Sequence, residues 1–243
     1  MAGSILARLL YKEGIEFRAF DCLRKGRASF VSENLIGVKW YEDEKRQRAL
    51  GILDGIVQIR QIISEGKGYH HVYRSDLLLG ADMVIQQEAE FLKDGVISDG
   101  VFYPGVNIDC RGVWSPNQKT KVGHGLFMSG KQIEWIKDYK PFRLLKFIEH
   151  SPGVMWFSNS MDVLLKTYSK ELFKFRDELL NARDESQTSQ HHAYEFGYRP
   201  DGEKAIKKQP YGYQMSGGYK SGLVDYPIMA TELIKLLKYE HAI

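Results

Sequence analysis

The segment from Gly95 to Met128 interrupts the helical periodicity of this chain. It is rich in Gly, Pro, Val, Phe and Tyr, and three short runs in it have strand character, at residues 101–103, 106–110 and 125–128. Strands gathered between two helical regions are typical of α+β folds and not of alternating β/α folds. The sequence therefore predicts an α+β fold, predominantly α-helical, with a small central antiparallel sheet at about residues 96–128.

Apolar residues recur at spacings of three and four in several segments on either side of that sheet. These spacings predict helices over residues 5–12, 41–64, 75–95 and 161–179. The helix over 41–64 rests on Ile52, Ile56, Ile59 and Ile63. Residues 15–20 instead alternate apolar and polar side chains, which predicts a half-buried strand.

The segment at residues 185–226 matches neither a helix nor a strand. Prolines and glycines interrupt it throughout, and it is longer than an ordinary loop. Its tyrosines are unusual for a disordered chain. We therefore expect a globular domain at residues 1–184, an extended Gly/Tyr-rich arm at 185–226 that orders on a partner, and a docking helix at 227–243.

Charge and cysteine usage narrow the protein class. Lys and Arg together number 34 and Asp and Glu 31, so no single sign dominates the surface. The two cysteines, Cys22 and Cys110, have no metal-ligand spacing and are too few for a disulfide framework.

No apolar run approaches the roughly 20 residues of a membrane helix, and the first residues lack the features of a secretory signal. We expect an intracellular, reducing location, no secretion, no membrane, no metal and no cofactor.

Three charged residues around the predicted sheet are candidates for catalysis: Asp99, Asp109 and Arg111. A metal-dependent nuclease uses two acidic groups and a lysine on one phosphate. Arginine in place of that lysine is not readily deprotonated but can hold a phosphate. Asp99-Gly100 is also a common turn dipeptide, and charged residues beside strands usually form a solvated rim.

Residues 102–117, FYPGVNIDCRGVWSPN, resemble a strand and turn of the single-subunit, phage-type RNA polymerases. Asn107, Asp109, Arg111 and Gly112 match the motif, Trp114 takes its aromatic place, and Val113 replaces the second arginine. The catalytic-aspartate motifs of that family are not found in this chain, which excludes a complete polymerase. The resemblance implies a split or degenerate subunit.

The arm contains cations interleaved with aromatic side chains, and these are the predicted residues for binding a partner or nucleic acid: Arg199, Lys204, Lys207, Lys208, Tyr211, Tyr213, Tyr219 and Lys220. Lysines reach phosphates and tyrosine rings stack on bases. Tyrosine and glycine equally form adaptable protein interfaces. Nearby acidic residues weaken the local positive field, which favours a protein partner.

Two functions therefore remain open from the sequence. The first is a non-enzymatic assembly or scaffold protein that engages a neighbouring subunit, of the same or another chain, through the arm. The second is a nucleic-acid-binding or nucleic-acid-processing protein, either nuclease-like or a degenerate polymerase subunit. Walker, G-x-G-x-x-G, H-E-x-x-H, G-x-S-x-G and kinase motifs are all missing from the sequence. The sequence therefore favours a protein without enzymatic activity.

Overall fold

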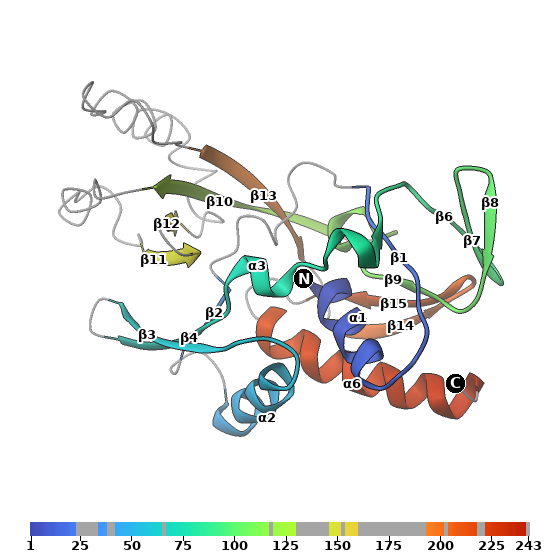
Figure 1. Ribbon diagram of the computed structural model, residues 1–243, viewed down its shortest axis with the longest axis horizontal. Helices are drawn as coiled ribbons and strands as arrows, with labels where there is room; N and C mark the ends of the chain where they lie inside the picture. Colours follow the sequence, from blue (N-terminus) through green and yellow to red (C-terminus); the bar gives the residue numbers. More distant parts are fainter. Residues whose placement is uncertain are drawn as a thin grey trace.

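The fold mixes helices and small sheets (Figure 1). The computed structural model describes residues 1–22, 34–37, 42–64, 67–116, 119–129, 146–151, 154–159, 193–201, 204–217 and 222–241. This part of the chain has four α-helices and fifteen strands in five sheets. The predicted α+β class is confirmed, but helices do not predominate among the described residues.

Three helices from distant parts of the sequence form the core. Helix α1 (Ala2–Lys12) and helix α2 (Asp43–Asp54) both pack against the long helix α6 (Gly222–His241), as Figure 1 also shows. Each helix buries one apolar face, which includes Ile5, Leu6 and Leu9 of α1, Leu50 and Leu53 of α2, and Leu233, Ile234 and Leu237 of α6. Among the described helices, none is long and apolar enough to cross a membrane.

A mixed sheet lies beside α6. Strands β14 (Ala205–Gln209) and β15 (Gly212–Ser216) form an antiparallel hairpin, and β15 also pairs in parallel with β9 (Asn107–Asp109). The hairpin packs on α6, and Tyr213 and Met215 are buried there. The parallel pair therefore joins residues about 105 positions apart in the sequence.

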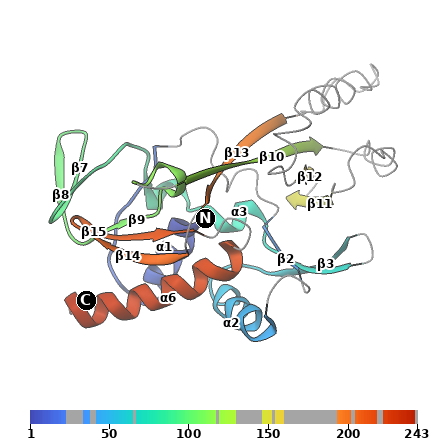
Figure 2. The ribbon, with the colours of Figure 1, turned by 180° about the vertical axis from the view of Figure 1, so that it is seen from behind.

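Two further sheets are built from strands that precede β9 in the sequence. Strands β6 (Glu90–Leu92), β7 (Gly95–Ser98) and β8 (Val101–Pro104) form an antiparallel meander, visible at the left of Figure 2. Strand β1 (Ala19–Phe20) pairs in parallel with β5 (Val84–Ile85), which follows the 3-10 turn Ala81–Met83. The pair β1–β5 places the residues after helix α1 next to those before the meander.

The remaining sheets are antiparallel. One has the order β2 (Leu35–Gly37), β4 (Lys67–His71) and β3 (Arg60–Ser64), followed by the short helix α3 (Arg74–Leu77). The other has the order β11 (Lys146–Ser151), β12 (Val154–Asn159), β10 (Lys119–Ser129) and β13 (Ala193–Asp201).

Two predicted helices are wrong. The helix predicted over 41–64 ends at Asp54, and its last residues form strand β3. The helix predicted over 75–95 is replaced by α3 and strands β5 and β6. Both stretches contain β-branched or alternating residues that fit a strand once a partner strand is available. The helix predicted over 161–179 lies outside the described residues.

The predicted sheet and arm are also corrected. Strands β8, β9 and β10 occupy the three predicted positions, but they belong to three different sheets. The segment predicted as an irregular arm contains β13, β14, β15 and the start of α6. Its strands are stabilised by partners far away in the sequence, such as β9 and β10, and no local pattern reveals such pairing.

Candidate functional site

The starts of two helices meet the end of a strand at one place in the molecule. A Cβ on Gly3 in α1 would lie 3.3 Å from Cβ of Cys110, which follows β9, and a Cβ on Gly222 in α6 would lie 3.2 Å from Sδ of Met1. Figures 1 and 2 both place the chain's N-terminus beside the start of α6. We call this region the strand-end site. It comprises the N-termini of α1 and α6 and the described residues that directly follow three strands: Asp21 after β1, Cys110 after β9 and Gly217 after β15.

The chemistry of the strand-end site favours an anion. The first N–H groups of a helix have no partner within the helix, and the helix dipole gives that end a partial positive charge. Met1 caps α1 without a side-chain hydrogen bond, and no acidic residue lies in its first turn. In α/β folds, ligands bind where parallel strands end at their carboxyl side. Phosphate groups match this environment.

Asp21 is one acidic residue of the strand-end site; the other, Asp225 in the first turn of α6, is paired with Lys204 at 2.8 Å. Asp21 directly follows β1, and its backbone N–H donates to the carbonyl of Ile85 at 3.1 Å. It lies 18 residues after Gly3, with a helix and a strand in between. An acidic residue about 20 residues after a helix-starting glycine is the usual partner of ribose hydroxyls in dinucleotide-binding folds.

Asp109, a predicted catalytic residue, is fully buried at the end of β9 and pairs with Arg111. Arg111 donates from Nε to Oδ1 at 3.0 Å and from Nη2 to Oδ2 at 2.9 Å, and its backbone N–H also donates to Oδ1. Ser115 Oγ donates to Oδ1 at 2.8 Å. Burial alone would raise the pKa of Asp109, but these hydrogen bonds outweigh it and lower the pKa below its ordinary value.

Arg111 connects Asp109 to two aromatic rings. Its guanidinium carbon lies 4.6 Å from the centroid of Phe91, and Phe91 stacks on Tyr211 at 5.1 Å. The hydroxyl of Tyr211 donates to Asp109 at 3.3 Å, and burial raises the pKa of Tyr211 to about 12. The hydrogen bond to Asp109 raises the pKa of Arg111, with smaller electrostatic contributions from Tyr211 and Cys22. Because Cys22 is the second residue after β1, Arg111 lies near the end of that strand.

The two candidate carboxylates are not brought together. Asp99 occupies the turn between β7 and β8 with φ of 48°, beside Gly100. The turn interpretation of this dipeptide is confirmed. The carboxylate oxygens of Asp109 already accept hydrogen bonds from Arg111, Ser115 and Tyr211. Among the residues with described side chains, no cluster of three His, Cys, Asp or Glu could hold a metal ion.

Most of the described arm residues contact the rest of the chain. Lys204 pairs with Asp225 at 2.8 Å, Lys208 pairs with Glu240 at 2.9 Å, and the hydroxyl of the buried Tyr213 donates to Glu240. These three residues fasten the β14–β15 hairpin to α6.

The other arm residues are placed as follows. Lys207 lies in β14 opposite Gln214, and Arg199 lies in β13 opposite Lys121. Tyr219 and Lys220 are outside the described residues.

The sequence reasoning missed Gly3, Asp21 and the helix starts. The available signal was the order of helix, strand and acidic residue in the first 21 positions. The full G-x-G-x-x-G motif, which would mark such a site, does not occur in this sequence. Cys110 was noted only for its spacing; burial and the nearby Asp109 raise the pKa of its thiol to about 12.

Comparison with known proteins gives a fold-level match. No protein family and no curated protein matches the sequence. Three similar solved structures are an FAD-dependent oxidoreductase from Pseudomonas aeruginosa (13% identity, TM-score 0.61), iminodiacetate oxidase from Chelativorans sp. (11%, 0.62) and glycine oxidase from Bacillus cereus (13%, 0.58). Each match covers 98% of this chain, and it covers 88%, 93% and 94% of those chains, respectively.

These matches overturn the functional expectations from sequence. A fold shared with oxidoreductases over 98% of the chain points to an enzyme fold and not to an assembly or scaffold protein. The nucleic-acid alternatives, nuclease-like or polymerase-like, are contradicted by the same comparison. The polymerase-like residues Asn107, Asp109 and Arg111 form strand β9 and the internal ion pair at its end.

Proposed function

We propose that this protein binds FAD at the strand-end site and acts as a flavin-dependent oxidoreductase. The proposal is carried by one observation: the fold shared with such enzymes places two helix N-termini, Asp21 and the end of β9 around one site. The helix starts favour phosphate and Asp21 has the position expected for ribose.

The residues of the strand-end site fit the pyrophosphate and ribose of a dinucleotide. The backbone N–H groups at the start of α1 and α6 would hold the pyrophosphate, and the Asp21 carboxylate would accept hydrogen bonds from the ribose. Gly3 allows α1 to approach the end of β9 closely, because its missing side chain leaves room for Cys110.

A bound flavin supplies two-electron oxidation and reduction of the substrate. The protein's own residues would then bind and orient the flavin and the substrate. The thiol of Cys110 stays protonated at neutral pH because its pKa is about 12. It is therefore a packing residue and not a nucleophile in this proposal.

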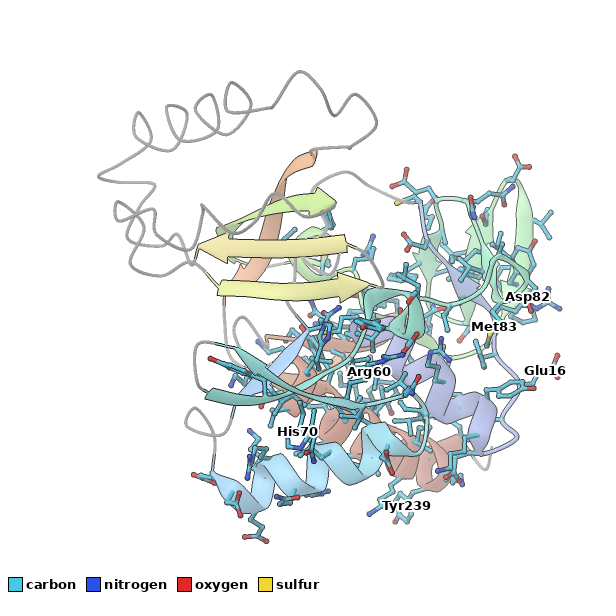
Figure 3. All side chains as sticks on the ribbon, turned by 60° about the vertical axis from the view of Figure 1, so that its left-hand side comes forward. Glu16, Arg60, His70, Asp82, Met83 and Tyr239 are labelled. Carbon is cyan, nitrogen blue, oxygen red and sulfur yellow. The ribbon has the colours of Figure 1, made fainter. Side chains whose placement is uncertain are left out.

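The experiment is a binding measurement followed by an activity assay. The purified protein is inspected for the visible absorbance of flavin, stripped of ligand, and titrated with FAD while tryptophan fluorescence is followed. Asp21→Asn should weaken FAD binding roughly tenfold, since a hydrogen bond to a charged group contributes about 1.5 to 3 kcal/mol. Glu16→Gln is the matched control, because the exposed Glu16 lies between α1 and β1, five residues before Asp21, and points away from the molecule (Figure 3).

The activity assay uses glycine, iminodiacetate and L-amino acids as substrate probes, with an artificial electron acceptor that is reduced as the substrate is oxidised. Saturable FAD binding that Asp21→Asn weakens and Glu16→Gln does not is the expected result. No saturable binding of FAD to the folded protein would overturn the proposed function.

A further inference from the structure

Arg111 is held in place on two sides. Its Nε and Nη2 atoms donate to the two oxygens of Asp109, and the Phe91 ring covers another part of the guanidinium at 4.6 Å. Even so, 37% of the Arg111 side chain stays exposed. The structure therefore presents a guanidinium plane that is fixed in orientation before any ligand arrives.

The charge of this plane is compensated within the protein. Asp109 is 0% exposed and makes a two-pronged ion pair with Arg111, so the pair has no net charge. Two of the five guanidinium N–H bonds are used by the Asp109 side chain. A flat guanidinium with its charge compensated is better suited to stacking on a planar aromatic group than to attracting a phosphate.

The position of Arg111 specifies which planar group could reach it. Arg111 follows β9 by two residues, and it interacts electrostatically with Cys22, the residue after Asp21. Asp21 is where the ribose is proposed to bind, and a base is attached directly to its ribose. A base extending from that ribose would lie beside Cys22 and Arg111.

We infer that the guanidinium of the partly exposed Arg111, on the side that Phe91 does not cover, is the platform on which the adenine base of the bound nucleotide stacks. This inference rests on the proposed nucleotide site at the strand ends. It assigns Arg111 a role in binding the base, separate from the phosphate-binding helix starts and from the ribose-binding Asp21.

The test compares a nucleotide with its phosphate part alone. Binding of ADP and of inorganic pyrophosphate is measured by calorimetry on wild type and on Arg111→Lys, which keeps the charge and loses the plane. We expect ADP affinity to fall roughly tenfold, because the lysine ammonium has no plane on which the base can stack. Pyrophosphate affinity should change less than about twofold. An equal loss for both ligands would show a phosphate contact and overturn the inference.

A matched control is available in the same chain. Arg60 also pairs with a carboxylate, at 2.8 Å from Asp76, and also lies over an aromatic ring, 3.8 Å from the centroid of Tyr73. It belongs to the β3–β4 sheet, as Figure 3 shows. Arg60→Lys should leave the affinities for ADP and pyrophosphate unchanged, and a loss of ADP affinity equal to that of Arg111→Lys would overturn the inference.

A measurement on wild type keeps the inference testable if Arg111→Lys does not fold. In protein labelled with 15N-arginine, the assigned Nε–H resonance of Arg111 should move on addition of ADP, through the ring current of the base, and stay in place with pyrophosphate. No movement with saturating ADP would overturn the inference while nucleotide binding itself stands. If FAD, ADP and pyrophosphate all fail to bind, the proposed function falls and this inference falls with it.

Discussion

Gly212 of β15 lies directly against the backbone of Asn107 of β9. A Cβ on Gly212 would clash with the Asn107 carbonyl oxygen and lie 3.0 Å from its nitrogen. Asn107 in turn donates from Nδ2 to the carbonyls of Leu92 at 2.6 Å and Gly95 at 2.8 Å. This pair therefore joins the hairpin β14–β15, the strand β9 and the meander.

The first prediction concerns this close approach. Gly212→Ala should destabilise the protein by at least about 2 kcal/mol, because the added methyl meets backbone atoms and φ of 138° disfavours any side chain. The measurement is the free energy of unfolding from urea denaturation. Gly51→Ala is the control, since nothing lies within 4 Å of its Cβ position in α2, and it should stabilise by roughly 0.5 to 1 kcal/mol. Equal effects of the two variants would contradict the structure.

A second prediction concerns the buried ion pair. Asp109→Asn should lower the free energy of unfolding by about 3 to 5 kcal/mol at neutral pH, because the Arg111 guanidinium and Ser115 lose a charged partner. Asp82→Asn, in the 3-10 turn before β5 (Figure 3), should change it by less than about 0.5 kcal/mol.

A third prediction concerns how the difference in the free energy of unfolding between wild type and Asp109→Asn depends on pH. The folded-state pKa of Asp109 lies below its ordinary value of 3.8. The unfolded chain therefore binds the proton first, and the contribution of Asp109 is fully present above about pH 4 and is lost as the pH falls through the folded pKa. Urea denaturation of wild type and Asp109→Asn between neutral and acidic pH should show the gap closing only in acid. A difference in unfolding free energy that stays the same down to the lowest pH measured would contradict the lowered pKa of Asp109.

The core of α1, α2 and α6 provides a fourth prediction. Leu233 in α6 is fully buried, so Leu233→Ala should cost about 2 to 5 kcal/mol. Tyr239 lies in the same helix but is 89% exposed and points outward (Figure 3). Tyr239→Ala should therefore change stability by less than about 0.5 kcal/mol. Thermal unfolding of both variants checks the orientation of α6.

The two thiols should differ sharply in reactivity. Cys22 is exposed, whereas burial raises the pKa of Cys110 to about 12. A thiol with that pKa contains almost no thiolate at mildly alkaline pH. Iodoacetamide should alkylate Cys22 and leave Cys110 unmodified in the folded protein, as peptide mass spectrometry would show. Labelling of Cys110 at the same rate before and after denaturation would contradict its low reactivity in the folded protein.

Apolar spacing within one segment predicted helix α1 correctly but failed at strand β3, which depends on its partner strand. The stripe of Leu6, Leu9 and Leu10 predicts α1, because a helix face can be recognised within one segment. Strand β3 was mistaken for helix, because Ile59 and Ile63 satisfy both periods and only the pairing with β4 decides between them.

The site was harder to predict than the helices. Asp109 and Arg111 were predicted as candidates for catalysis, but their spacing could not show that they form an ion pair with each other. The approach of Gly3 to Cys110 joins residues more than one hundred positions apart. Such a site is created by tertiary packing, which a search for local motifs does not detect.

The packing of α1 on α6 has a consequence for synthesis of the chain. About 210 residues must be translated between Lys12 and Gly222 before the apolar face of α1 meets its partner helix. At a translation rate of roughly 5 to 20 residues per second, this takes on the order of 10 to 40 s. During this interval the apolar face of α1, with Ile5, Leu6 and Leu9, is not covered by α6 and is accessible to chaperones on the nascent chain.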